Sequence, residues 1–505
     1  MKIKMKSIAF MLPVVLWANA AFSSDDFSAI DRYVNAAKKE IGVPTGTAIA
    51  IVKNGKIVYE ASFGYANIKE NKKVTNKTAF YIASITKPMF ALSTLLMEYK
   101  GDIKDSTSMA KMFPKQVFPH IDAEKIQLKH LMSNTSGIEN WMLVDTLAFT
   151  GNHNNDQRHK LMVDSTYNEK NKLGQYEYTN LGFNIVSIWA EDYYQQDWQQ
   201  TIAELIYEPL GMTHTSSYMS DASKKGFEVA RPYSLSSIDP REVYPFEKSN
   251  VTMHGAGGTI ATVSDMARFL IAQLNEGKVE GKQVFPADVI KKSHQQLAVN
   301  NLKYRDFVRN GYAWGWYMGP YKDEDMYHHF GGVAGTHTHS SYMLEHNIGL
   351  VVLNNESHMS SKLTNAIADI AYTVLLDKGN AEEKADLHIT EMKNTWVKVE
   401  VNIKESLAKT KKVNAERVMV LSETKSKYTG MFHNNLWGDL TVELLGSNEF
   451  KFTLGELITV ATAYTKTDTM RIEFPAMGGG KVVTFDITNG KIQGLKLLGE
   501  YFNKA

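Results

Sequence analysis

A serine and a lysine three residues apart, Ser84 and Lys87, stand directly before an apolar run at residues 89–97. If that run is a helix, both side chains lie on one face about one turn apart, with the serine at the N-terminus. A lysine held there and partly desolvated can lose its proton near neutral pH and take one from the serine. The helix dipole would also favour negative charge on a substrate oxygen beside Ser84. The spacing therefore predicts a nucleophile with its base attached.

Spacing alone is a weak signal, because Ser-x-x-Lys recurs where a solvated surface pair is the simpler interpretation. Pro88 strengthens the first pair, since proline fits a helix only in its first turn and so supports a helix entrance at Ser84. The alternative for Ser84 is a plain N-cap serine. The other three pairs are Ser108–Lys111, Ser406–Lys409 and Ser422–Lys425.

Two further motifs, Tyr178-Thr179-Asn180 and His329-Phe330-Gly331, follow Ser84 along the chain. This order resembles the S-x-x-K, S-D-N and K-T-G motifs of serine β-lactamases and penicillin-binding proteins. Tyr-x-Asn is similar to the class C β-lactamase branch, and His-x-Gly to the esterase and D-peptidase relatives. The resemblance runs from about residue 25 to about residue 375. Its other landmarks are segments 43–60, 130–137, 208–212 and 257–267.

The resemblance implies a catalytic role for the first two motifs. Ser84 would attack a carbonyl carbon and form an acyl-enzyme, which water later clears. Lys87 and Tyr178 would act as a coupled pair of proton-transfer groups, and either could take the serine proton. A tyrosine needs a nearby cation to act as a base near neutrality, and Lys87 could supply it. Asn180 would hold Lys87 or the substrate amide by hydrogen bonds.

The third motif would lie on the strand that lines the site, with the imidazole of His329 where relatives place an ammonium. The N–H of Gly332 would pair with that of Ser84 as an oxyanion hole, because the glycine-rich strand at Gly331 lets substrate approach the backbone. Neither a fixed cation nor a threonine hydroxyl is present to hold a substrate carboxylate. This departure argues against strong β-lactam turnover and D-Ala-D-Ala carboxypeptidase activity. His329 could bind an anion when protonated, and a packed histidine is the alternative.

Five histidines between residues 328 and 346 raise the question of a metal site: His328, His329, His337, His339 and His346. His337 and His339 would share one face of a strand, as ligands must. No Asp or further His completes a metal-binding spacing, and the chain has no cysteine. We therefore expect histidines that lie at the surface or line the site, with no metal and no other cofactor.

The N-terminus combines a lysine-rich start, a mostly apolar run from Ile8 to Trp17 and the small-x-small sequence Ala18-Asn19-Ala20. This pattern predicts a signal peptide at residues 1–20 and a periplasmic or secreted bacterial protein; a membrane anchor is the alternative. Cleavage would change the formal net charge from +1 to −2. A near-neutral surface argues against a nucleic-acid partner. We expect no stable membrane insertion after cleavage, and a small-molecule or peptide substrate as the partner.

Strand-like segments lie on both sides of a long helical middle, which predicts an α/β (α+β) fold. We expect one antiparallel sheet built from both ends of the domain, flanked by helices and carrying an inserted helical region, as in β-lactamases and transpeptidases. Asn54-Gly55 predicts a tight hairpin turn. The segments are strands at 45–63, 311–317 and 337–354 and helices at 88–100 and 181–206.

The C-terminal part of the chain differs in character. We expect a catalytic domain at residues 21–378, a charged helical linker at 379–420 and a β domain at 421–505. Gly478-Gly479-Gly480 and Asn489-Gly490 supply turns between short strands. These turns predict a small barrel or sandwich, similar to the accessory domain of several penicillin-recognising hydrolases.

The leading interpretation is an exported serine hydrolase that cleaves an amide or ester through a Ser84 acyl-enzyme. Within that class we favour a peptidase or esterase, with D-amino-acid peptides as one candidate substrate. One alternative is a class C-like β-lactamase. Another is a non-catalytic penicillin-recognising binding or sensor protein, against which the intact Ser84, Lys87 and Tyr178 argue. The natural substrate and the oligomeric state stay open.

Overall fold

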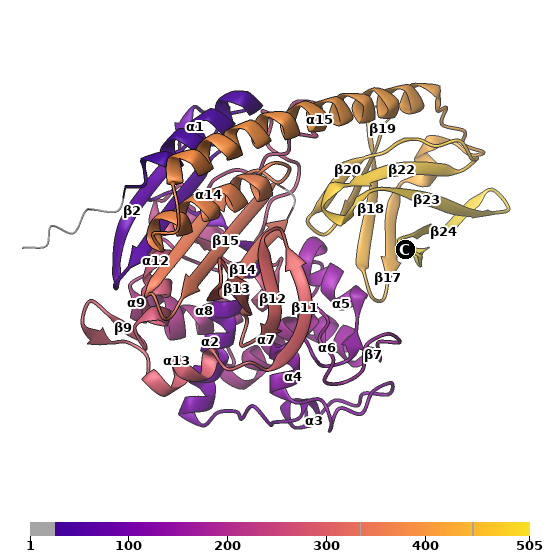
Figure 1. The fold of residues 1–505 in the computed structure, drawn as a ribbon. Helices are drawn as coiled ribbons and strands as arrows, with labels where there is room; N and C mark the ends of the chain where they lie inside the picture. Colours follow the sequence, from indigo (N-terminus) through magenta and orange to yellow (C-terminus); the bar gives the residue numbers. More distant parts are fainter. Residues whose placement is uncertain (1–25, 334, 447–448) are drawn as a thin grey trace, which may run out of the picture.

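Two bodies of secondary structure are joined by one long helix, α15 (Ala381–Glu416), in the computed structural model of the chain (Figure 1). The structure describes residues 26–333, 335–446 and 449–505. The predicted signal peptide at residues 1–20 lies outside these ranges. Across the described ranges, every helix is too short or too polar to cross a lipid bilayer.

An eight-stranded antiparallel sheet forms the centre of the first body, in the spatial order β11-β12-β13-β14-β15-β16-β1-β2. The N-terminal hairpin lies beside the last strand of the body, since Thr47 of β1 pairs with Asn354 of β16. The sheet is therefore built from both ends of the domain, as predicted. Its strands are β1 (Thr47–Lys53), β2 (Lys56–Phe63), β11 (Ala298–Tyr304), β12 (Phe307–Tyr312), β13 (Tyr317–Tyr321), β14 (Glu324–Val333), β15 (Thr336–Met343) and β16 (Ile348–Asn354).

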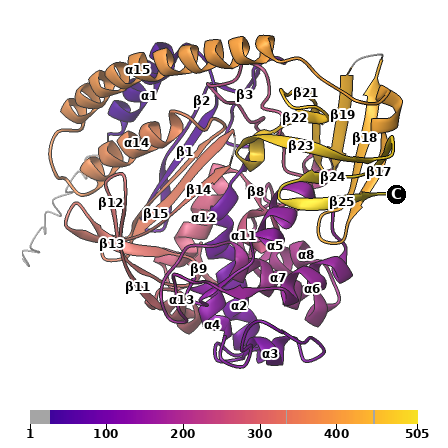
Figure 2. The same ribbon diagram turned by 90° about the vertical axis from the view of Figure 1, so that its right-hand side faces the viewer.

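Helices cover both faces of this sheet, which explains why the five central residues of β1, 48–52, are all apolar and buried. Alternate residues of a strand point to opposite faces. Ile49 and Ile51 pack with α1 (Ser28–Ile41), α14 (Ser360–Leu375) and α15. Ala48, Ala50 and Val52 pack with the opposite layer, which includes α2 (Thr86–Lys100) and α12 (Val263–Leu274). Figure 2 shows α1, α14 and α15 together on one side of the sheet.

The helices of the inserted region are shorter than the sequence pattern predicts. The helix predicted at 181–206 is broken, because α7 (Leu181–Tyr194) ends at Gln195 in the left-handed conformation, with φ 53°. α8 (Trp198–Ile202) follows as a separate helix. The remaining elements of the region are α3 (Met109–Met112), α4 (Leu128–Met132), α5 (Trp141–Asp145), α6 (Asn155–Val163), α9 (Glu208–Leu210), α10 (Ser220–Lys225), α11 (His254–Gly257), α13 (Ala287–Ser293), and the single turns η1 (Ala83–Ile85), η2 (Thr146–Thr150) and η3 (Ala203–Tyr207).

The strand predicted at 311–317 is also two strands. β12 ends at Tyr312 and β13 begins at Tyr317, with a turn closed by the N–H of Ala313, which donates to the oxygen of Trp316 (2.8 Å). Gly315 lies in this turn at φ +79°, and a Cβ there would come within 2.8 Å of the backbone of Lys87. The turn therefore packs on the first turn of α2. Eight two- or three-residue strands complete the body: β3 (Tyr65–Asn67), β4 (Lys72–Lys73), β5 (Phe80–Tyr81), β6 (Ile138–Glu139), β7 (Thr166–Tyr167), β8 (Ile260–Ala261), β9 (Lys278–Val279) and β10 (Lys282–Gln283).

The C-terminal body is a nine-stranded antiparallel sheet in the order β20-β19-β18-β17-β25-β24-β23-β22-β21. β20 contacts β22, so the sheet curls into a nearly closed barrel. Its interior is aromatic, with Phe432, Trp437, Phe450 and Phe452 fully buried. Its elements are η4 (Lys425–Tyr428), β17 (Gly430–Asn434), β18 (Gly438–Leu445), β19 (Glu449–Leu454), β20 (Leu457–Val460), β21 (Thr462–Ala463), β22 (Thr469–Phe474), η5 (Pro475–Met477), β23 (Gly479–Thr488), β24 (Lys491–Leu497) and β25 (Glu500–Lys504).

The barrel contacts the helical region at α5 and η2. The rings of Trp437 and Trp141 lie 6.0 Å apart. Asn152 donates its amide to the Trp437 oxygen (2.7 Å), and the N–H of Glu456 donates to the Thr150 oxygen (2.7 Å). These contacts tie two barrel turns to the segment that connects α5 with α6.

Gly182 allows α7 to approach α4 closely, because a Cβ at this position would lie 2.0 Å from the oxygen of Leu131. We expect Gly182→Ala to lower the free energy of unfolding by at least about 2 kcal/mol through this clash. Urea unfolding measures the change. Gly332→Ala is the matched control, since a Cβ there meets nothing within 4 Å. Equal losses in the two variants would contradict the close packing.

Gly455 tests the contact between barrel and helical region. A Cβ there would lie 2.0 Å from the Thr150 oxygen, whereas a Cβ at Gly446 meets nothing within 4 Å. The two glycines have similar φ, +57° and +60°, so alanine adds about 1–2 kcal/mol of left-handed strain at either site. We expect only Gly455→Ala to speed amide exchange in η2, by roughly tenfold for about 1.4 kcal/mol lost beyond the shared strain. Identical exchange in both variants would show that the contact does not hold η2.

Candidate active site

Ser84 lies in the turn η1, directly before α2, and is half-buried. Its predecessor Ala83 has φ 48°, a left-handed conformation that is uncommon for a residue with a Cβ and often marks functional sites. Ile85, not Ser84, is the N-cap of α2, and that cap has no side-chain hydrogen bond. The serine hydroxyl therefore does not cap the helix, in contrast to the plain N-cap interpretation.

Lys87 is fully buried and its amine has three polar neighbours. The Nζ lies 3.0 Å from Ser84 Oγ, 2.7 Å from Asn180 Oδ1 and 2.7 Å from the backbone oxygen of Ala256. No carboxylate pairs with this amine in the described chain. Burial consequently holds the pKa of Lys87 well below its ordinary value of 10.5.

Tyr178 contacts both Ser84 and Lys87. Its hydroxyl donates to Ser84 Oγ at 2.8 Å, and the Lys87 Nζ lies 4.9 Å from its ring centroid. The ring stacks on Tyr317, although 40% of the residue is exposed. Desolvation of the hydroxyl and the neighbouring Tyr317 raise the pKa of Tyr178 above its ordinary value. A base role for Tyr178 would require a lowered pKa, so the raised pKa argues against that role.

Asn134, a residue that the sequence analysis did not single out, positions the second motif. Its backbone oxygen accepts from the N–H of Glu177 (2.8 Å), and its Oδ1 accepts from the N–H of Thr179 (3.2 Å). It lies at φ 58°, which asparagine tolerates better than most residues. Its place in the landmark segment 130–137 was the available signal. These two bonds hold the segment from which Tyr178 reaches Ser84.

The backbone carbonyl of Ala256 accepts from Lys87, and this contact could not be predicted from the types of the residues. Ala256 belongs to the four-residue helix α11, which packs on α2, and a Cβ on Gly255 would lie 2.9 Å from the ring of Phe90. The glycines of segment 255–258 thus let the backbone come close enough to accept from Lys87. A glycine-rich stretch was the only sequence signal for this contact.

The third motif lies on β14, beside η1. β13 pairs with β14 only as far as Tyr317 opposite His328, so beyond this point that edge of β14 has no strand partner in the described chain. A Cβ on Gly331 would lie 2.1 Å from the oxygen of Ile82, which shows how closely the strand approaches the Ser84 turn. Gly332 is exposed, and a Cβ there would meet nothing within 4 Å. The glycines therefore leave open backbone beside the serine.

His329 faces this site but is only 1% exposed. Its Nδ1 lies 2.7 Å from the Phe330 oxygen, to which it donates, and its Nε2 lies 3.4 Å from the Tyr312 hydroxyl. Burial, then the neighbouring Lys87 and Arg309, hold the pKa of His329 well below its ordinary 6.5. The ring is neutral at physiological pH, which argues against the anion-binding role considered for a protonated His329.

The other clustered histidines lie in packed or ion-paired surroundings. His328, His337 and His339 are buried among aromatic rings, whereas the sequence predicted histidines that lie at the surface or line the site. His346 pairs with Glu324 at 2.8 Å. Among the residues that the structure describes, no group of three or more potential ligands is arranged to hold a metal ion.

Arg309 on β12 places a cation close to the site, whereas the third motif has no fixed cation. Its guanidinium lies 3.8 Å from the ring centroid of Tyr317, the ring that stacks on Tyr178. The Nε is buried and has no hydrogen-bond partner in the described chain. Nothing in the sequence pattern distinguished this arginine from other residues of a polar strand.

The chain is similar in sequence or in fold to several known proteins. The protein flp of Staphylococcus aureus (strain NCTC 8325 / PS 47) is 26% identical over 339 residues, 66% of this chain and 64% of that protein. The octameric penicillin-binding protein homologue from Pyrococcus abyssi has a TM-score of 0.61 at 20% identity, covering 94% of this chain and 99% of the other. The D-amino acid amidase from Ochrobactrum anthropi SV3 has a TM-score of 0.54 at 17% identity, covering 69% and 98%.

The chain thus spans less than two thirds of the length of the staphylococcal relative. The family model described as Beta-lactamase matches residues 30–373, well over half of the chain, and this range contains all three motifs. The protein belongs to the beta-lactamase family, whose members share this fold and are generally serine hydrolases.

Proposed function

We propose that the protein is an exported serine hydrolase that cleaves an amide or ester through an acyl-enzyme on Ser84. The observation that carries the proposal is the set of contacts around the buried Lys87 amine. Asn180 Oδ1 and the Ala256 oxygen, both 2.7 Å away, can only accept hydrogen bonds. A neutral amine has two N–H groups for these acceptors, so its lone pair is left for the hydroxyl of Ser84.

Lys87 is therefore the general base in this proposal. As Ser84 Oγ bonds to the substrate carbonyl carbon, the serine proton passes to Nζ, 3.0 Å away. Tyr178, which has a raised pKa, keeps its proton and serves as the acid. It protonates the leaving amine or alcohol when the carbonyl–heteroatom bond breaks. The proton on Lys87 then passes to the Tyr178 oxygen, which restores both groups. Water attacks the acyl carbon and gives a proton to Lys87. As the bond between the acyl carbon and Ser84 Oγ breaks, Oγ takes that proton and the acid product is released.

The developing oxyanion would lie between the backbone N–H groups of Ser84 and Gly332. The close approach of Gly331 to Ile82 and the exposed position of Gly332 support this arrangement. The uncharged His329 and the absence of K-T-G favour an esterase or peptidase over a class C-like β-lactamase. The D-amino acid amidase among the fold neighbours is consistent with amide hydrolysis, and D-amino-acid peptides are candidate substrates.

Labelling with a fluorophosphonate tests the nucleophile. We expect a single adduct on Ser84, visible in the intact mass and in peptide mapping, and none on Ser84→Ala. Hydrolysis of p-nitrophenyl acetate should fall by at least about a thousandfold in Ser84→Ala. Ser108→Ala, the serine of another Ser-x-x-Lys pair, should change neither result. A wild-type protein that shows neither fluorophosphonate labelling nor ester hydrolysis would indicate a binding protein. Hydrolysis that Ser84→Ala keeps in full would contradict Ser84 as the nucleophile.

The pH dependence of kcat/KM tests the base. A lysine whose folded pKa is depressed becomes active as pH rises through that pKa, so kcat/KM should rise with pH and level off well below 10.5. Lys87→Arg keeps its positive charge and should lose roughly a hundred- to ten-thousandfold in rate. Lys111→Arg is the control for the surface pair. An acidic limb that persists unchanged in the residual activity of Lys87→Arg would assign the base to another group.

A further inference from the structure

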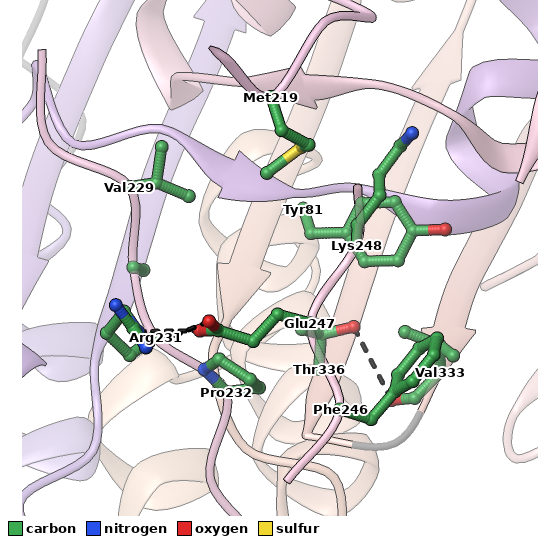
Figure 3. Close-up of a pocket in the computed structure, with 11 residues that line it drawn as sticks. Tyr81, Met219, Val229, Arg231, Pro232, Phe246, Glu247, Lys248, Val333 and Thr336 are labelled. Atoms are coloured by element: carbon green, nitrogen blue, oxygen red, sulfur yellow. Dashed lines mark hydrogen bonds and ion pairs between the residues drawn. The ribbon is translucent and has the colours of Figure 1, made fainter. Parts of the chain in front are cut away.

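A pocket adjoins the site where β14 ends at Val333. It has a volume of about 240 Å³. Figure 3 shows its walls, which come from β5, the end of β14 and the segments 229–232 and 246–248. The lining residues are Tyr81, Met219, Val229, Ala230, Arg231, Pro232, Phe246, Glu247, Lys248, Val333 and Thr336.

Both sides of this pocket are continuous with the catalytic elements. Tyr81 precedes Ser84 by three residues, and Val333 directly follows Gly332. Ala83, which precedes the serine, belongs to the same apolar cluster as Tyr81. A substrate carbonyl between Ser84 and Gly332 would therefore direct one of its two substituents into the pocket.

The positions of the aromatic rings indicate which substituent this is. Tyr178, the proposed acid for the leaving group, packs against His329 with ring centroids 6.0 Å apart. His329 and Val333 lie at opposite ends of the unpaired edge of β14. The leaving group must lie near Tyr178, at the His329 end. The acyl group consequently extends past Val333 towards the pocket.

The lining offers no free charge to a substrate. Arg231 and Glu247 neutralise each other at 2.6 Å. Lys248 donates to the oxygens of Ser249 (3.1 Å) and Thr252 (2.8 Å), and its amine points away from the ion pair (Figure 3). Burial lowers the pKa of Lys248 to about 7, which further weakens its charge. The hydroxyl of Tyr81 is buried with no hydrogen-bond partner in the described chain, and is left for a neutral polar atom.

We propose that this pocket selects the acyl group of the substrate, and that it takes an uncharged, mainly apolar group. This inference rests on the proposed function of Ser84. A cavity of about 150 Å³ binds benzene, so a pocket of about 240 Å³ holds on the order of ten heavy atoms. Butanoyl, hexanoyl and phenylacetyl groups meet this limit, and a dodecanoyl chain exceeds it.

A series of p-nitrophenyl esters tests the pocket: acetate, butyrate, hexanoate and dodecanoate. We expect kcat/KM to rise from acetate to hexanoate by at least tenfold, since two buried methylenes give roughly that factor, and to fall for dodecanoate. Val229→Phe fills the pocket and should reduce the hexanoate-to-acetate ratio to near one. Met219→Trp fills it from another wall and replaces this test if the first variant does not fold. Val117→Phe, at a residue 79% exposed, should keep the wild-type ratio.

A second measurement separates this inference from the proposed function. Hexanamide binding to Ser84→Ala, followed by saturation-transfer NMR, needs no catalysis and should disappear in Ser84→Ala/Val229→Phe. Hydrolysis through Ser84 with no preference for hexanoate, or a preference that both filled variants keep, would overturn the pocket assignment alone. Hexanamide binding that depends on Val229, without labelling of Ser84, would overturn the hydrolase and keep the pocket.

Discussion

The site is organised around the buried amine of Lys87. Moving an ammonium out of water without a counter-charge costs several kcal/mol, so the buried Lys87 is held towards its neutral form. A neutral amine still needs acceptors for its N–H groups, and these come from the start of α7 and from α11. The fold must therefore fix three separate elements around one nitrogen. This requirement explains why segments far apart in the chain converge beside Ser84.

Close backbone approach meets this requirement. Gly182 brings α7 against α4, Gly255 brings α11 against the ring of Phe90, and Gly331 brings β14 against Ile82. At each of these positions a Cβ would collide with its neighbour. The left-handed Ala83 belongs to the same arrangement, because it lies directly before Ser84 in the turn η1, which contacts both α2 and β14. Close approach at these glycines therefore contributes to the geometry around the serine.

The sequence predicts some features of the site and of the fold and not others. Motif order and family resemblance predict the sheet built from both ends of the domain. They also predict that Ser84, Lys87, Tyr178 and Asn180 come together. The break at Gln195 could not be predicted from the pattern, because the apolar periodicity continues across this residue although the helical backbone ends there. The carbonyl of Ala256 could not be foreseen, because every residue has a carbonyl and only tertiary packing orients this one. The charge of His329 depends on burial by Tyr312 and Tyr317, which no local pattern encodes.

The unpaired edge of β14 divides the site by polarity. At one end, Tyr178, Tyr317 and the guanidinium of Arg309 surround the neutral His329. At the other end, Val333 begins an apolar wall. A substrate that spans this edge meets hydrogen-bonding and cationic groups on its leaving side and an uncharged surface on its acyl side. The family resemblance locates the reacting serine, whereas substrate choice must follow from this asymmetry, because Tyr317, Arg309 and Val333, which help to create it, lie outside the three motifs.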